Sequence, residues 1–142
     1  MSEVVDLPDT LCWQAFELWE QGRLDAAVPL YETSARMGHS AAQIHLGTLM
    51  DDHLEPRRPL RAIYWYVRAF RNEEPSAAWN LAMHYVPRGN RRWFRFWIKK
   101  AAEAGHEDAI DELKKLNFDP NYITVLPFIE QDNDPCEAVD DE

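Results

Sequence analysis

The residues best suited to metal binding or acid–base chemistry are few and scattered along the chain. The five histidines are His39, His45, His53, His84 and His106. No two of them are three or four residues apart, and a zinc site needs clustered ligands. The cysteines Cys12 and Cys136 do not lie near any histidine, and five glycines leave no phosphate-binding loop motif. We therefore expect no catalytic residue, no metal site and no cofactor.

The positions of three histidines nevertheless indicate particular roles. His39 and His106 each directly follow a glycine that ends a helical pattern, which favours a role in the turn. His84 lies beside Tyr85 within an expected helix, and we treat it as a candidate for contact with a partner.

Arginines and aromatic residues gather in one stretch of the chain, and they are the clearest candidates for a binding surface. The members of this group are Trp79, Trp93, Phe94 and Phe96, together with Arg91, Arg92 and Arg95. Trp and Arg are enriched where protein interfaces gain most of their energy. Arg91, Arg95 and Lys99 recur at intervals of four, so they share one side of a helix.

Charge is distributed unevenly along these 142 residues, whose formal net charge is −10. Residues 57–100 hold eleven basic and two acidic residues, a net charge of +9, whereas residues 1–56 carry −8 and residues 117–142 carry −8. Three interpretations stay open. The basic residues pair with acids of neighbouring helices, they bind an acidic partner or nucleic acid, or they receive the acidic tail. The acidic flanks would repel a long polyanion, which makes nucleic acid the less favoured ligand.

The elements that position these residues are predicted to be helices throughout. Apolar residues recur at helical spacing, and no segment before residue 120 alternates as a strand does. A first helix begins at Asp9 or Thr10 and stops at Gly22. The others cover residues 24–37, 40–50, 60–71, 75–85, 91–104 and 107–116, with a loop at 51–59.

These helices repeat. Ala42, Ala77 and Ala109 occupy equivalent positions that are 35 and then 32 residues apart. Leu46, Leu81 and Leu113 keep the same spacings. Each helix pair leaves an apolar face that only the next pair buries, so we expect the pairs to stack. Aromatic residues at repeat positions are expected in the core, namely Trp13, Trp19, Tyr31, Trp65, Tyr66 and Trp97.

The repeat resembles the Sel1-like repeat family, which is related to the tetratricopeptide repeat. Three stretches carry the resemblance: Ala42, Leu46 and Gly47; then Ala62, Trp65, Tyr66, Arg68 and Ala69; then residues 100–105 with Ala109 and Leu113. It covers residues 11–116, although Phe70, Glu73 and Ala82 depart from the family pattern. The resemblance implies an all-α fold, a right-handed α–α superhelix (solenoid) of about three helix pairs. An all-α bundle is the alternative.

The resemblance also implies binding of a protein partner, because members of the family act as adaptors, scaffolds or antidotes to toxins. Solenoids present a groove lined by the first helix of each pair. We expect the stripe of Ile44, Thr48 and Asp51 to align there with Trp79, Met83 and Val86. The predicted partner-binding residues are Ile44, Thr48, Asp51, Trp79, Met83, His84, Trp93, Arg91 and Arg95.

Residues 117–142 are expected to form a separate tail after the repeat domain of residues 1–116. Residues 122–129 are apolar and β-prone, and residues 130–142 are acidic. The apolar stretch either caps the open end of the last repeat or lies along the groove or the basic stripe until a partner displaces it.

Together these features predict a non-catalytic interaction module with one protein partner, such as a toxin, an effector or a secretion component. The alternative is binding of nucleic acid or another acidic ligand through the Arg/aromatic stripe of residues 57–100. No run of 18 apolar residues and no signal sequence occur, so we expect a cytoplasmic location and no membrane partner.

Overall fold

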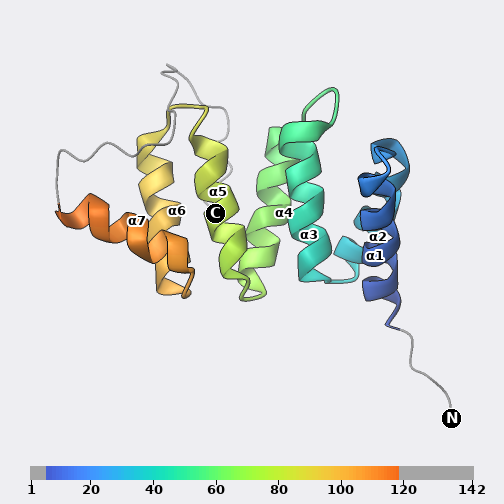
Figure 1. Cartoon of the computed structure of the whole chain (residues 1–142), viewed down its shortest axis with the longest axis horizontal. Coiled ribbons are helices and arrows are strands. Elements are labelled where there is room, and N and C mark those ends of the chain that lie inside the picture. Colours follow the sequence, from blue (N-terminus) through green and yellow to red (C-terminus); the bar gives the residue numbers. More distant parts are fainter. Residues whose placement is uncertain (1–5, 119–142) are drawn as a thin grey trace, which may run out of the picture. The chain divides into compact units, whose positions relative to one another are not determined.

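Helices account for all the regular structure in the described part of the chain. The computed structural model describes residues 6–118, which form seven α-helices and one π-helical turn, with no strand among them (Figure 1). The elements are α1 (Leu7–Glu20), α2 (Leu24–Arg36), α3 (Ser40–Thr48), η1 (Leu49–His53), α4 (Pro59–Arg71), α5 (Pro75–Tyr85), α6 (Arg91–Glu103) and α7 (Glu107–Phe118). The predicted all-α class is confirmed. Within residues 6–118, no helix combines the length and apolar character needed to cross a membrane.

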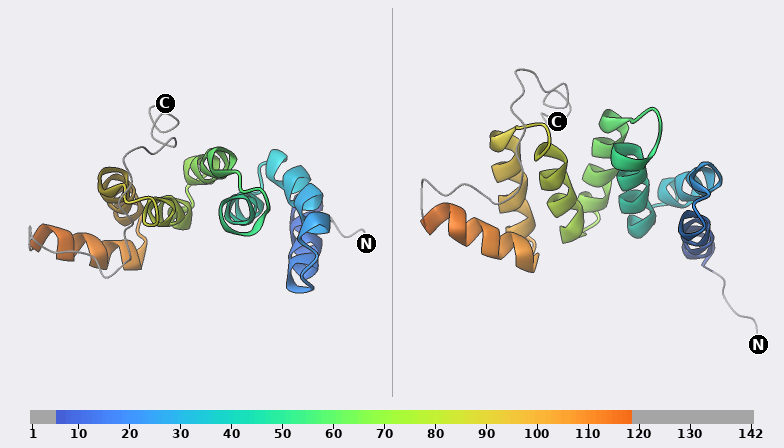
Figure 2. Two further views of the ribbon diagram at one scale, coloured as in Figure 1. Left: turned by 90° about the horizontal axis from the view of Figure 1, so that it is seen from above. Right: turned by 45° about the horizontal axis from the view of Figure 1, so that its top comes forward.

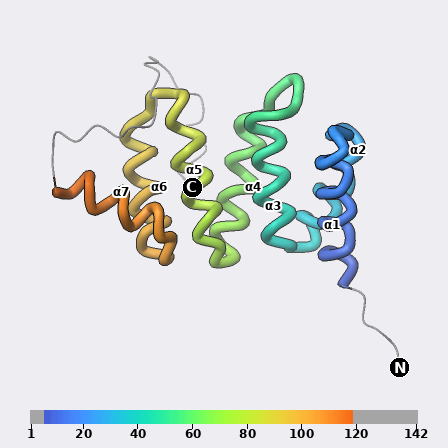
Figure 3. Tube along the Cα trace, viewed as in Figure 1, coloured from blue at the N-terminus to red at the C-terminus, as the bar shows by residue number. Residues whose placement is uncertain are grey.

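The chain divides between Ala69 and Phe70 into two units, and each is described by itself. In the first unit α1 and α2 run antiparallel, as the tube in Figure 3 shows. Ala15 of α1 and Ala27 of α2 are fully buried, which lets the two helices approach closely. Ser34 Oγ in α2 donates a hydrogen bond of 2.6 Å to the carbonyl of Pro8 and so ties the end of α2 to the start of α1.

The third helix packs against α2 and is linked to α4 at one point of very close approach. Gln43 Nε2 of α3 donates a buried hydrogen bond to the carbonyl of Ala35 in α2. A Cβ atom added to Gly47 would lie 2.7 Å from Tyr66 Cε1 of α4. Thr48 Oγ1 lies 3.0 Å from the hydroxyl of the same tyrosine, so a hydrogen bond fixes the ring against α3. Only glycine at position 47 leaves space for this ring.

The second unit contains α5, α6 and α7, which are neighbours in sequence and in space. Figure 2 shows α5 and α6 side by side and α7 crossing α6 at a steep angle. Three of the six buried residues of α5 are small, namely Ala77, Ala78 and Ala82. The buried face of α6 is large and aromatic, with Phe94 and Trp97 among its residues. Small residues opposite large ones allow these helices to pack without voids.

Several boundaries and one core assignment differ from the sequence-based expectations. The first helix begins earlier, because Asp6 Oδ1 accepts a hydrogen bond from the backbone N–H of Asp9 and caps it. Residues 49–53, of which the last three were expected in a loop, continue α3 as η1, and α7 extends to Phe118. Trp13 was expected in the core, but it is 63% exposed. The expected tail lies outside the described residues, apart from its first two positions.

The close contact between α3 and α4 yields a stability prediction. Gly47→Ala forces the buried Tyr66 ring to move, and such overpacking typically costs about 1–3 kcal/mol. Alanine also favours the helical conformation over glycine by about 1 kcal/mol, which offsets part of this cost. We expect a net loss of about 1 kcal/mol in the free energy of unfolding, measured by urea denaturation.

The matched control removes the ring of Tyr66 and leaves position 47 as the site of the change. In a Tyr66→Leu background the same Gly47→Ala change meets no ring, so it should stabilise the protein. Destabilisation of similar size in both backgrounds would contradict the proposed contact.

Candidate functional site

The outer side of α6 carries a group of exposed basic residues around one exposed aromatic ring. We define the α6 basic face as Arg91, Arg92, Arg95, Phe96 and Lys99, all of which are exposed. Its formation follows from helical periodicity. The buried residues of α6 recur at intervals of three and four, so the charged positions between them must face outward.

A layer of aromatic rings supports this face from below. The ring of Phe96, 41% exposed, meets Trp93 and Trp97 edge-on, with centroids 5.1 Å apart in both cases. The Arg92 guanidinium lies 5.4 Å from the centroid of the Trp93 ring. The ammonium of Lys100 lies 5.5 Å from the centroid of the Phe96 ring. A cation this close to the face of an aromatic ring is attracted to it.

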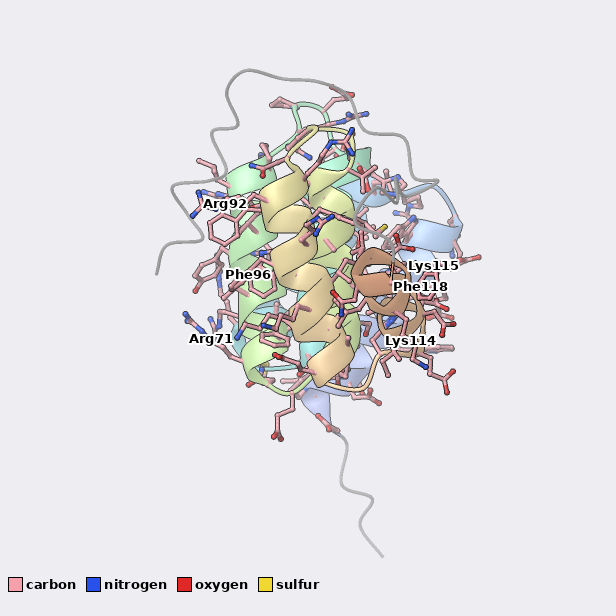
Figure 4. The ribbon with its side chains drawn as sticks, turned by 90° about the vertical axis from the view of Figure 1, so that its left-hand side faces the viewer. Arg71, Arg92, Phe96, Lys114, Lys115 and Phe118 are labelled. Carbon is pink, nitrogen blue, oxygen red and sulfur yellow. The ribbon has the colours of Figure 1, made fainter. Side chains whose placement is uncertain are left out.

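Three of the cations on the α6 basic face have no acidic partner in the part of the chain that the structure describes. Within residues 6–118, no acidic side chain forms an ion pair with Arg92, Arg95 or Lys99. Figure 4 shows that Arg71, Arg92 and Phe96 point to one side of the second unit. The side chains of Lys114, Lys115 and Phe118 point to the other side in the same view. This face can therefore attract an anionic surface and offer it an apolar contact at Phe96.

The residues predicted to bind a partner divide into accessible and buried ones. Arg91 and Arg95 are exposed, and the side chains of Ile44, Thr48, Trp79 and Met83 are partly exposed. Asp51, His84 and Trp93 are buried, with 6%, 2% and 7% of their surface exposed.

The burial of these three residues differs from the accessible positions expected for a contact surface, and their part in partner binding stays a prediction. Trp93 turns inward because it lies on the same side of α6 as Phe94 and Trp97. His84 is enclosed beside the Tyr85 ring, 4.9 Å from it between centroids. The stripes of Ile44 and of Trp79 belong to different units, and their alignment in a groove stays a prediction.

The two histidines that follow glycines do hold turns, as predicted. Gly38 and Gly105 adopt φ angles of 93° and 99°, a conformation that side chains with a Cβ rarely reach. The Nδ1 atom of His39 accepts a hydrogen bond from the backbone N–H of Ala42, and His106 Nδ1 accepts one from Ala109. Each imidazole thus caps the start of the following helix, in the way that Ser or Asp usually does.

A cavity of about 330 Å³ lies between α1 and the beginning of α3 in the first unit. The residues that line it are Asp9, Cys12, Trp13, Phe16, His39, Ala41 and His45. Sequence reasoning missed this site because Trp13 was assigned to the core. A usable signal was present, since positions 9, 12, 13 and 16 follow the spacing of one helical face.

The chemistry of this cavity favours binding over catalysis. Burial, and next the charge of Asp9, raise the pKa of the Cys12 thiol to about 11, so the thiol stays protonated and is a poor nucleophile at neutral pH. Burial is also the main reason that the pKa of His45 is lowered, with His39 as the second cause. Among the described residues, no three potential ligands are grouped so that they could hold a metal ion.

No protein-family model, curated protein or solved structure matches this chain.

The lowered pKa of His45 predicts how stability changes with pH. Below the ordinary histidine pKa of about 6.5, the unfolded chain takes up a proton that folded His45 resists. The free energy of unfolding should thus fall as the pH decreases from 6.5 toward the lowered pKa. His45 contributes at most about 1.4 kcal/mol per pH unit to this slope.

His45→Phe keeps a ring among Phe16, Trp19 and Tyr31 but cannot titrate. We expect a shallower loss of stability between pH 6.5 and 5 in this variant, measured by urea denaturation at a series of pH values. An unchanged slope would show that His45 titrates alike in the folded and unfolded states.

Proposed function

We propose that this chain is a non-catalytic protein-interaction module that binds one protein partner. The α6 basic face would contact an acidic surface of that partner. The observation that carries this proposal is that Arg92, Arg95 and Lys99 have no acidic partner within residues 6–118, beside the exposed ring of Phe96 that packs on Trp93. Basic and aromatic side chains held in place lose little entropy on binding, which suits them to an interface.

The repeats support a more specific proposal, namely that the module is a Sel1-like solenoid. The helix pairs, the small residues at equivalent positions and the Leu46-Gly47 pair suit Sel1-like units, about three of which would stack as a right-handed solenoid. A module of this kind acts as an adaptor or as an antidote that holds a toxin, an effector or a secretion component. We place it in the cytoplasm.

Nucleic acid is the second candidate ligand for the same face. The stripe of arginines favours it, because phosphate contacts of this kind dominate affinity for nucleic acids. Two observations weigh against it. Trp93 and Trp97 are buried, so on the α6 basic face Phe96 alone offers a ring for base stacking. Residues 1–56 also carry a net charge of −8.

A capture experiment with paired charge reversals tests the proposal. The tagged full chain is used as bait in nuclease-treated lysate of its source organism at moderate salt. We expect the wild type to retain one protein in near-equal amount. Reversal of Arg92, Arg95 and Lys99 to Glu should reduce the retained amount by roughly tenfold or more, because charge complementarity is lost.

The control reverses charges on the other side of the second unit. Lys114→Glu with Lys115→Glu should leave capture nearly unchanged, and circular dichroism checks that both variants keep their helicity. Equal loss in the control would point to net charge as the cause. Retention by the wild type that occurs in untreated lysate but not in nuclease-treated lysate would favour the nucleic-acid alternative.

A further inference from the structure

The cavity between α1 and α3 has an aromatic wall that is open to solvent. Trp13 and Phe16 lie one helical turn apart on α1, and their rings are near-parallel, with centroids 6.0 Å apart and planes at 27°. His45 of α3 continues the wall, 6.0 Å from Phe16 between centroids. Trp13 remains 63% exposed, so a large ring face is available at the mouth of the cavity.

The carboxylate of Asp9 lies at the edge of this wall, within hydrogen-bond distance of His39. His39 Nδ1 accepts a hydrogen bond from the Ala42 N–H, so that nitrogen carries no proton. The remaining nitrogen, Nε2, therefore bears the hydrogen and donates it to Asp9 Oδ1 at 3.2 Å. A neutral imidazole positions the Asp9 side chain without cancelling its negative charge.

The two helices that line the cavity, α1 and α3, contain no lysine or arginine. Residues 6–22, which include α1, contain four acidic residues and no lysine or arginine. Residues 40–48, which form α3, contain no lysine or arginine and no acidic residue. The residues that line the cavity likewise include none. An aromatic wall beside a carboxylate in negative surroundings attracts a cation more than it attracts an apolar group.

We propose that this cavity is a binding site for an arginine side chain of a protein partner. The planar guanidinium would stack on the face of Trp13 and hydrogen-bond to the Asp9 carboxylate, whose second oxygen has no partner in the described part of the chain. A cavity of about 330 Å³ is at the small end of ligand sites, which suits one side chain. This site goes beyond the proposed function, because it is in the other unit and takes the opposite charge.

The test compares two probes that have nearly the same shape. N-acetyl-argininamide and N-acetyl-citrullinamide are titrated separately, at millimolar concentration, into the ¹⁵N-labelled full chain. The indole N–H signal of Trp13 is assigned by its loss in Trp13→Phe. We expect arginine to shift this signal and the amides near Asp9 in a saturable way. The neutral citrulline should bind at least about tenfold more weakly.

Two variants locate the charge effect. Asp9→Asn keeps the shape of the side chain and should weaken arginine binding roughly tenfold. Asp25→Asn removes an exposed acid at the start of α2, away from the cavity lining, and should leave binding unchanged.

Three results would overturn the proposal. The first is equal binding of citrulline, which would define an apolar site. The second is full binding to Asp9→Asn. The third is the absence of a saturable shift at Trp13. None of them depends on capture of a partner by the α6 basic face, so failure here is distinct from failure of the proposed function.

Discussion

The α-helices of this protein have 9 to 14 residues, and they pack together where small side chains on one helix leave space for large side chains of the next. In the first unit this constraint is sharpest at Gly47, where the ring of Tyr66 occupies the space that any Cβ would need. In the second unit three buried alanines of α5 accompany the aromatic residues of α6. Burial of these rings supplies the main driving force for folding. It also decides where charge is placed, because the positions between buried rings have only solvent to face.

The two histidines that cap helices, His39 and His106, also contact neighbouring side chains. His39 and His106 each use one ring nitrogen to start a helix. The rest of each ring then acts elsewhere. The Nε2 atom of His39 contacts the Asp9 carboxylate, and the ring of His106 stacks on Trp79 with centroids 4.9 Å apart. Each of these capping histidines therefore also contacts a side chain that is accessible to a ligand.

The net charge of −10 hides two local fields of opposite sign. The α6 basic face belongs to the second unit, and the acidic aromatic cavity belongs to the first. Local fields of this kind govern how a partner approaches, whereas the sum over the chain mainly affects solubility. On our two proposals, one partner could offer an acidic surface to α6 and an arginine to the cavity, or two partners could bind separately.

The sequence by itself determined the class of fold and most of the positions at which helices end and turns begin. Helical spacing, the glycines before His39 and His106, and the outward charges of α6 are local properties, and a short stretch of chain contains all that specifies them. Tertiary structure decided which aromatic and polar residues are accessible. Trp13 was expected inside and is exposed, whereas Asp51, His84 and Trp93 were expected at a surface and are buried. Burial depends on which neighbouring helix covers a position, and the periodicity of one helix does not contain that information.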